Sequence, residues 1–512
     1  MTTQPQSGKY RPVTPLAITD RQWPARTQQK APRWCSVDLR DGNQALPEPM
    51  SPGKKLSLYK QLIAMGYKEI EVGFPAASET DYQFVRNLIE QNLVPEGVRI
   101  QVLSQMRAEQ IRQTVTSLCG IKEAVIHLYN STSAQQREQV FNLSRDEVLA
   151  LALQGVRWLI AELKSIEQNW ILEYSPESFT ATEPDFATEI CNAVIDLWVR
   201  ETGREIIINL PATVELTSPN VYADRIEWMA GQLHHREYVT ICVHPHNDRG
   251  CAVAAAEMAM LAGAERVEGT LFGNGERTGN VDLVTLGLNL QIQGIDPGID
   301  FSQLPQIINT YEATTGMSVP ARHPYAGSLV FTAFSGSHQD AIRKGLEQQK
   351  RRIHWNVPYL PIDPHDIGRN YEGIIRLNGQ SGKGGLGYLL EYYYGIRPPR
   401  PLLILFQQHI QALADANNKE LEHGLLYQQF HAFFATDAVP LDAFSLTVEC
   451  GFQVQWDSHR LGTCQNISYG WARCHGELIY GVGVAESEAE SRQRAWQKLR
   501  LAYAGLQSSV CC

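Results

Sequence analysis

The sequence lacks the features that mark membrane-spanning and secreted proteins. No uninterrupted apolar run approaches the roughly 20 residues that span a bilayer. Residues 1–10 are polar and contain no apolar stretch of the kind found in a signal peptide. The cysteines form no Cys-x-x-Cys pair, and Cys35 and Cys242 lie in apolar segments where reduced thiols pack well. We therefore expect a protein of the reducing cytoplasm with no membrane partner.

Two further absences narrow the class of protein. The net charge is −10 at pH 7, so the chain lacks the excess of positive charge typical of proteins that bind nucleic acid or an anionic membrane. No glycine-rich loop follows the first expected strand, which argues against a dinucleotide-binding, doubly wound sheet. The glycine-rich stretch 379–387 includes Lys383 but lacks the spacing of a phosphate-binding loop.

The first half of the chain does contain a regular alternation of strand and helix patterns. Short apolar runs typical of strands cover residues 34–38, 69–73, 99–103, 124–128, 170–174, 205–209, 239–243 and 266–271. Most of them are continuous, as expected for parallel strands buried on both faces. Helical patterns such as 54–65 and 80–91 lie between them. Eight such units in about 250 residues predict an α/β fold, the (β/α)8 or TIM barrel.

Beyond about residue 300 the alternation stops, and a helical linker region and a small C-terminal α+β module are expected. In that module we expect strands near 444–449, 466–473 and 478–484 and a last helix over 486–504. The predicted domains are an N-terminal extension (1–33), the catalytic barrel (34–300), linker subdomains (301–436) and the α+β module (437–512).

Functional residues of a barrel collect where its strands end at the C-terminal rim. Asp41 follows the first expected strand, and His244 and His246 end the seventh. Other polar or distinctive residues at the same level are His127, Tyr129, Glu173, Ser175, Glu177, Pro211, Thr213 and the segment 273–280.

Asp41, His244 and His246 have the composition of a catalytic metal site. Residues two apart in a strand point to the same face, so the two imidazoles can hold one ion together. One carboxylate and two imidazoles leave coordination positions open for a substrate. Arg40 adds a fixed cation that can face an oxyanion. A lone His-x-His is more often a hydrogen-bonded strand end, so the prediction depends on both segments sharing one rim.

The segments around these residues resemble the signatures of a known family. They are Leu39-Arg40-Asp41-Gly42-x-Gln44, followed after ten further residues by Lys55, and Ile241-x-x-His244-x-His246-Asn247-Asp248-x-Gly250. Both resemble signatures of the isopropylmalate and homocitrate synthases. Over about residues 8 to 400 the chain is similar to the longer, actinobacterial and fungal type of isopropylmalate synthase, in the segments 69–75, 127–133, 173–178, 209–215, 273–280 and 334–342.

The resemblance implies a Claisen-type condensation of acetyl-CoA with 3-methyl-2-oxobutanoate, the first committed step of leucine biosynthesis. It implies Mg²⁺ or Mn²⁺, with K⁺ as an activator. The metal ligands would be Asp41, His244, His246 and Asn280, and Arg40 would face the keto oxygen. The oxo acid would be held by His127, Tyr129, Ser175, Pro211 and Thr213.

The resemblance also places the catalytic base outside the barrel. His338 matches the residue proposed to take the proton from the acetyl methyl, acting with Glu177 or a water, and Tyr359 matches an assisting position. In the family this linker region covers the barrel of the partner subunit, so a homodimer is implied. After about residue 439 only one half of the family's two-part leucine-binding domain has a counterpart, and we therefore expect weak or absent leucine inhibition.

Other functions fit parts of the pattern. A citramalate- or homocitrate-type synthase would use another 2-oxo acid in the same machinery, a choice worth only about 1–3 kcal/mol in the acceptor pocket. A barrel metallohydrolase carries His-x-His at its first strand, not its seventh, and a non-haem iron oxygenase would not place an arginine beside the carboxylate. A regulatory subunit without activity conflicts with the intact catalytic positions.

Overall fold

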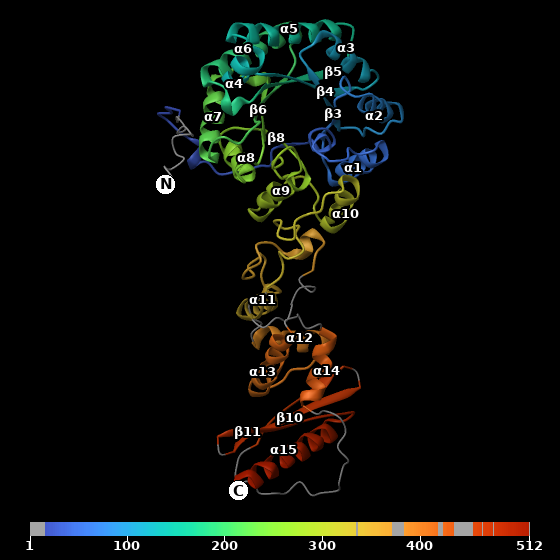
Figure 1. Ribbon diagram of the computed structural model, residues 1–512, viewed down its shortest axis with the longest axis vertical. Helices are drawn as coiled ribbons and strands as arrows, with labels where there is room; N and C mark the ends of the chain where they lie inside the picture. The colour runs from blue at the N-terminus through green and yellow to red at the C-terminus, as the bar shows by residue number, and fades with distance from the viewer. Residues whose placement is uncertain are drawn as a thin grey trace, which may run out of the picture. The chain divides into compact units, whose positions relative to one another are not determined.

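The computed structural model describes residues 16–333, 336–370, 383–417, 423–434, 454–462, 464–474 and 476–510. Eight strands at the start of the chain form a closed parallel barrel in the order in which they occur in the sequence (Figure 1). They are β1 (Arg33–Ser36), β2 (Glu69–Gly73), β3 (Arg99–Gln105), β4 (Glu123–Ser131), β5 (Asn169–Glu177), β6 (Ile206–Ala212), β7 (Val239–Pro245) and β8 (Arg266–Gly269). The predicted TIM barrel is confirmed.

Helices surround this barrel on its outside (Figure 1). They are α1 (Pro52–Met65), α2 (Glu79–Glu90), α3 (Ala108–Ser117), α4 (Ala134–Gln136), α5 (Arg145–Leu163), α6 (Pro184–Thr202), α7 (Pro219–Gln232), α8 (Ala252–Leu261), α9 (Leu283–Ile292) and α10 (Leu304–Thr315). Local sequence explains the bounds of α1. Ser51 caps its first turn by accepting from Lys54 N, and Gly66 ends it at φ 103°, a left-handed conformation that glycine adopts without strain.

The barrel interior departs from the expected apolar filling. The strands are buried on both faces, and β2, β6 and β7 are buried along their whole length. Yet the polar side chains of Glu71, Gln101, Glu173, Arg266 and Glu268 are fully buried inside it. The prediction that Glu173 belongs to the polar rim is therefore wrong. It lies within β5, below the rim, because that strand continues to Glu177.

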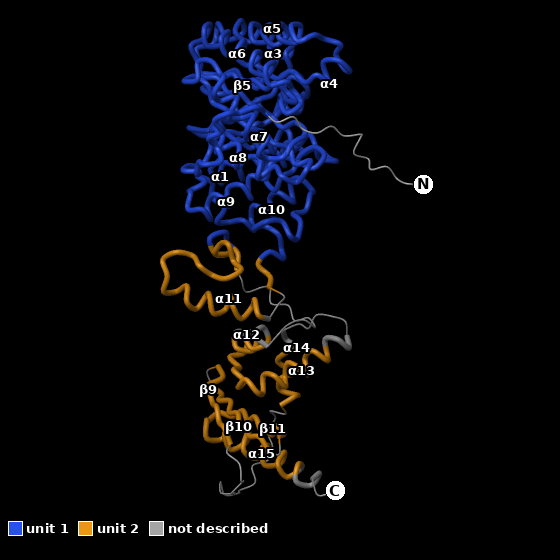
Figure 2. The backbone as a smooth tube through the Cα atoms, turned by 90° about the vertical axis from the view of Figure 1, so that its left-hand side faces the viewer, with its two compact units in different colours: residues 1–330, 366–368 blue, residues 331–365, 369–512 orange. Residues whose placement is uncertain are grey.

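The chain divides into two compact units, one of residues 1–330 with 366–368 and one of residues 331–365 with 369–512 (Figure 2). The second unit contains α11 (Gly336–Gln349), α12 (Lys383–Tyr394), α13 (Arg400–Asn417), α14 (His423–Phe433), β9 (Gln455–Leu461), β10 (Gln465–Cys474), β11 (Glu477–Ala485) and α15 (Glu488–Val510). The three strands form an antiparallel sheet in the order β11-β10-β9. Strand β9 was not predicted, and the strand expected near 444–449 lies outside the described residues.

This small sheet is covered on both faces. Phe406, Phe430 and Tyr469 belong to one apolar cluster that joins α12, α13 and α14 to the sheet. On the other face α15 packs so closely that a Cβ at Gly481 or Gly483 would meet the helix backbone at 2.0 and 2.1 Å. Glycine is therefore required where helix and sheet meet.

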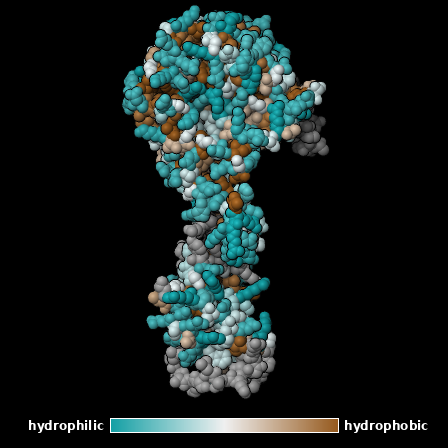
Figure 3. Space-filling view, turned by 180° about the vertical axis from the view of Figure 1, so that it is seen from behind, coloured by the Kyte–Doolittle hydropathy of each residue, from teal (hydrophilic) through white to brown (hydrophobic). Residues whose placement is uncertain are grey.

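Among the described residues we find no helix with the length and apolar character of a membrane span. Seen from the side shown in Figure 3, hydrophilic side chains cover most of the described surface, and hydrophobic ones are scattered among them. Such scattered exposure is normal for a folded protein.

Candidate functional site

A pocket of about 990 Å³ opens where the barrel strands end at their C-terminal rim. Ten of the residues that the sequence singled out line it, namely Arg40, Asp41, His127, Tyr129, Ser175, Glu177, Pro211, Thr213, His244 and His246. Asn280 does not line the pocket, but its Oδ1 lies 2.9 Å from His244 Nε2. Residues from β1, β4, β5, β6, β7 and the segment after β8 therefore meet at one place.

A single turn after β1 presents Arg40 and Asp41 to the pocket. The chain forms one π-helical turn over Asp38–Gly42. Asp38 fixes this turn from below, because its two carboxylate oxygens accept from Leu271 N at 3.1 Å and one accepts from Ser36 Oγ at 2.8 Å. The turn is thereby tied to the segment after β8.

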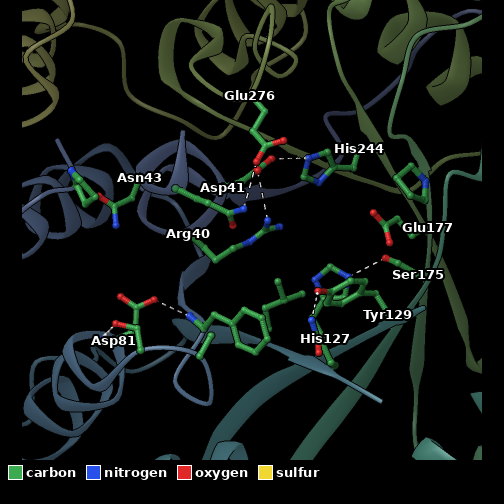
Figure 4. A pocket seen from close by; sticks show the side chains of 18 of the residues that line it. Arg40, Asp41, Asn43, Asp81, His127, Tyr129, Ser175, Glu177, His244 and Glu276 are labelled. Atoms are coloured by element: carbon green, nitrogen blue, oxygen red, sulfur yellow. Dashed lines mark hydrogen bonds and ion pairs between the residues drawn. The ribbon is translucent and has the colours of Figure 1, made fainter. Parts of the chain in front are cut away.

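Asp41, His244 and His246 converge on one point. One donor atom from each lies within 4.8 Å of the others, and all three residues are buried. His244 Nε2 lies 3.1 Å from Asp41 Oδ2, and His246 Nε2 lies 3.9 Å from the same oxygen. In Figure 4 the side chains of Asp41 and His244 point toward one another. His246 Nδ1 is buried with no hydrogen-bond partner in the part of the chain that the structure describes. This donor set fits a divalent cation.

Glu268 orients the central histidine of this set. Its Oε2 accepts from His244 Nδ1 at 2.8 Å, which leaves Nε2 as the nitrogen facing Asp41. Burial opposes a charge on His244, but hydrogen bonds to Asp41 and Glu268 outweigh it and raise its pKa to about 10. Burial and the neighbouring His244 charge lower the pKa of His246 to about 4. A divalent ion would therefore compete with one proton for this site.

Arg40 is held in place on two sides. Its Nε donates to Glu71 Oε2 at 2.5 Å, and its Nη1 lies 3.3 Å from Asp41 Oδ1. Burial opposes its charge, but Glu71 and Asp41 outweigh that effect and hold the pKa of Arg40 above its ordinary value. Burial likewise works against the Asp41 carboxylate, yet Arg40 and His244 keep its pKa far below the usual range. The site thus presents a fixed cation beside a fixed anion.

The opposite wall of the pocket offers hydroxyl, imidazole and carboxylate groups. His127 Nε2 lies 2.7 Å from Ser175 Oγ, and Tyr129 Oη accepts from Gln105. Ser131 Oγ, from the end of β4, donates to Glu177 Oε2 at 2.6 Å. These groups can bind a carboxylate or keto oxygen of a small acid by hydrogen bonds.

Comparison with known proteins identifies the family. The HMGL-like family model matches residues 31–310, and a model described as alpha-isopropylmalate synthase, post-catalytic domain-like, matches residues 328–391. The 2-isopropylmalate synthase of Parafrankia sp. (strain EAN1pec) is 56% identical over 440 residues, which cover 84% of this chain and 78% of that relative. The chain belongs to the 2-isopropylmalate synthase family. The synthase of Parvibaculum lavamentivorans is 53% identical over 467 residues, covering 90% of this chain and 83% of that relative. The synthase of Rhodospirillum rubrum is 55% identical over 428 residues, covering 83% and 77%.

Two expected catalytic residues of this isopropylmalate synthase family member lie in the second unit. His338 is on α11, and its ring stacks on the ring of Tyr359 with centroids 4.0 Å apart and planes at 24°. Tyr359 is 61% exposed and has a left-handed backbone at φ 65°. The two side chains therefore form one exposed pair. Their action at the pocket stays a prediction.

Sequence reasoning missed the buried residues that hold the site of this family member together. Glu71, Gln101 and Glu268 do not line the pocket and lie on the inward faces of β2, β3 and β8. A signal was present, because each is a polar residue that directly follows an apolar one inside a strand predicted to be buried. Their partners come from other strands, so the sequence pattern alone names the residues without their contacts.

Asp38 provides a test of the turn that carries Arg40 and Asp41. Burial raises its pKa to about 7, so the folded protein binds this proton more tightly than the unfolded chain does. The free energy of unfolding should therefore fall as pH rises between about 4 and 7, by about 1.4 kcal/mol for each unit of pKa shift. Asp38→Asn should remove this dependence, so its advantage over the wild type should grow from pH 5 to pH 8 by on the order of 2 kcal/mol.

Urea unfolding at both pH values, followed by circular dichroism, measures this difference. Asp196→Asn serves as control, because the Asp196 side chain is 44% exposed and pairs with His234 on the surface. Equal pH slopes for the wild type and Asp38→Asn would show that Asp38 is ionised in the folded protein.

Proposed function

We propose that this family member is a 2-isopropylmalate synthase. It condenses acetyl-CoA with 3-methyl-2-oxobutanoate to give (2S)-2-isopropylmalate and free CoA, the first committed step of leucine biosynthesis. The observation that supports this most directly is the triad of Asp41, His244 and His246 beside Arg40, in a pocket at the rim of a barrel. Free, buried thiols such as Cys35 and Cys191 agree with a cytoplasmic enzyme.

Mg²⁺ or Mn²⁺ would be held by Asp41, His244 and His246, with Asn280 as a fourth contact. The ion supplies Lewis-acid polarisation of the keto group when it is bound. K⁺ is included in the proposal as an activator.

Arg40 and the opposite wall would orient the oxo acid. His127, Tyr129 and Ser175 bind its polar end, and Pro211 and Thr213 border its side chain. Arg40 faces the keto oxygen, on which negative charge develops as the new carbon–carbon bond forms. Because Glu71 and Asp41 already hold the guanidinium, little reorganisation is needed when that charge appears.

A base must take a proton from the acetyl methyl before its carbon attacks the keto carbon. We assign this role to His338, assisted by Tyr359, with Glu177 at the pocket receiving or relaying the proton. Hydrolysis of the thioester then releases CoA. The ring of His338 lies in the second unit, and we propose that it serves the barrel of a partner subunit in a homodimer.

A mixture of two inactive variants tests this arrangement. His338→Ala and Arg40→Gln should each be nearly inactive. If each pocket takes its base from the partner, unfolding and refolding them together should restore about a quarter of wild-type activity, because half of the dimers are mixed and each has one intact site. Activity no higher than that of the separate variants would place His338 and Arg40 of one site in the same chain.

The activity itself is tested by the release of CoA, followed with a thiol reagent. Pyruvate, 2-oxobutanoate, 3-methyl-2-oxobutanoate and 2-oxoglutarate are compared, each with and without Mg²⁺, K⁺ and leucine. A preference for 3-methyl-2-oxobutanoate that requires the divalent ion supports the proposal. A preference for pyruvate or 2-oxoglutarate would indicate a citramalate- or homocitrate-type enzyme, and metal-independent release would contradict the assigned site.

A further inference from the structure

A fully buried glutamine lies at the centre of the polar network inside the barrel. Gln101 on β3 has no exposed surface. Its side-chain amide offers two N–H donors and one carbonyl acceptor. Nε2 donates to Glu268 Oε1 at 2.8 Å and to Glu71 Oε1 at 3.1 Å, and Oε1 accepts from Arg266 Nη2 at 2.8 Å. Both donors and the acceptor of the amide are therefore in use.

Each carboxylate that Gln101 joins holds residues of the pocket. Glu71 accepts from Arg40 Nε at 2.5 Å and from His127 Nδ1 at 2.9 Å. Glu268 accepts from His244 Nδ1 at 2.8 Å. The path from His244 through Glu268, Gln101 and Glu71 thus reaches both Arg40 and His127 by successive hydrogen bonds.

A similar path leads from Glu268 to the β6 side of the pocket. Asn209 Nδ2 donates to Glu268 Oε2 at 3.0 Å, and Asn209 lines the pocket. Through the two carboxylates, one amide on β3 therefore connects the metal ligand on β7 with pocket residues in the turn after β1, on β4 and on β6.

Placing these groups inside the barrel costs free energy that an apolar filling would not. Glu71 and Glu268 carry like charges and are both fully buried, so each needs a buried cation beside it, Arg40 for Glu71 and Arg266 for Glu268. Barrel interiors of this type are commonly filled by branched apolar side chains. A polar network that is only partly satisfied is worse than an apolar one, so each member depends on the others. The network holds the side chains of the pocket in fixed orientations, and this explains why it is retained despite its cost.

We propose that Gln101 is a positioning residue that couples the metal triad to the oxyanion and substrate side of the pocket. By fixing the distance between Glu71 and Glu268, it sets the orientation of His244 together with that of Arg40 and His127. The part of this inference that concerns metal binding rests on the triad alone, and the part that concerns binding of the oxo acid rests on the proposed function.

Two binding measurements on intact protein test the coupling without relying on turnover. Mn²⁺ affinity is measured by adding Mn²⁺ to the metal-free protein and following free Mn²⁺ by electron paramagnetic resonance. The affinity for 3-methyl-2-oxobutanoate is measured by calorimetry at saturating Mn²⁺ and without acetyl-CoA. Gln101→Met keeps the size of the side chain and removes both donors. It should raise both dissociation constants about tenfold, the lower end of the effect of losing an outer-shell partner of a metal ligand.

Variants of one carboxylate at a time separate the effect on Mn²⁺ binding from the effect on oxo acid binding. Glu268→Gln should raise the Mn²⁺ dissociation constant by about 10- to 100-fold. Glu71→Gln should leave the Mn²⁺ dissociation constant within about twofold of the wild-type value and should weaken binding of the oxo acid. Ser104→Ala is the matched control, because Ser104 is buried on the same strand and, three residues on, faces away from the barrel interior. It should change neither constant.

If Gln101→Met does not fold, as judged by circular dichroism, Gln101→Glu replaces it, since it keeps the shape and the Arg266 partner. The inference is overturned if the folded variant leaves both constants within about twofold of wild type, or changes only one of them. A wild-type protein that binds Mn²⁺ but not the oxo acid would overturn the proposed function, while weaker Mn²⁺ binding by the Gln101 variant would still support the link to the triad.

Discussion

His244→Ala is expected to abolish both Mn²⁺ binding and the release of CoA. His244 is the central member of the triad, since its Nε2 faces Asp41 and Asn280 and its Nδ1 donates to Glu268. A Lewis acid contributes several kcal/mol to such a reaction, so its loss should lower kcat/KM by about 10³-fold or more. Electron paramagnetic resonance of added Mn²⁺ and the thiol assay measure the two effects.

A histidine elsewhere on the barrel provides the control. His234 pairs with Asp196 on the surface and is more than half exposed, so His234→Ala should leave both measurements unchanged. Mn²⁺ bound by His244→Ala within about threefold of the wild-type affinity would show that the ion is held elsewhere.

Arg40→Gln is expected to lower kcat by about 10²- to 10³-fold, the cost of losing one oriented donor to a developing oxyanion. The affinity for Mn²⁺ should not fall, because Asp41 stays ionised at neutral pH and a nearby positive charge is removed. Arg40→Lys should recover little of the loss. A lysine cannot reach Glu71 and Asp41 together in the way that the two ends of the guanidinium do.

Steady-state rates at saturating metal, paired with the Mn²⁺ binding curve, separate these effects. Arg200→Gln is the matched control, because Arg200 is exposed on α6 and pairs with its neighbour Glu201. A variant at position 40 that loses Mn²⁺ affinity but keeps its kcat would assign Arg40 to the support of the triad.

The barrel could be predicted because its signals are local. Strand β2 has the predicted bounds, and β6 and β7 differ from them by no more than three residues at either end, since continuous apolar runs mark strands buried on both faces. Helix α1 ends at Met65, the last residue of the predicted helical pattern 54–65. Strand β9 was missed because its burial alternates weakly along a polar segment, Gln455–Leu461.

The pocket residues could be predicted for a related reason. Parallel strands in a barrel all end at the same rim, so His127, Ser175 and His244 had to meet once the strands were known. The supporting network could not be predicted in this way. Gln101 and Glu268 are 167 residues apart, and nothing in either strand specifies that their side chains pair. Only the closed barrel brings them together.

Arg40 and Asp41, to which we assign the reaction, lie on one short turn after β1, apart from the residues that shape the rest of the pocket. Arg40 and Asp41 are consecutive residues on one π-helical turn, so the spacing between the guanidinium and the carboxylate is set by bonds within a few residues. Ser175, Pro211 and Thr213 line the pocket from the ends of β5 and β6. Mutations there can reshape the pocket while Arg40 and Asp41 keep their spacing. On the proposed function, changes on β5 and β6 would therefore admit new acceptors without altering the reaction itself.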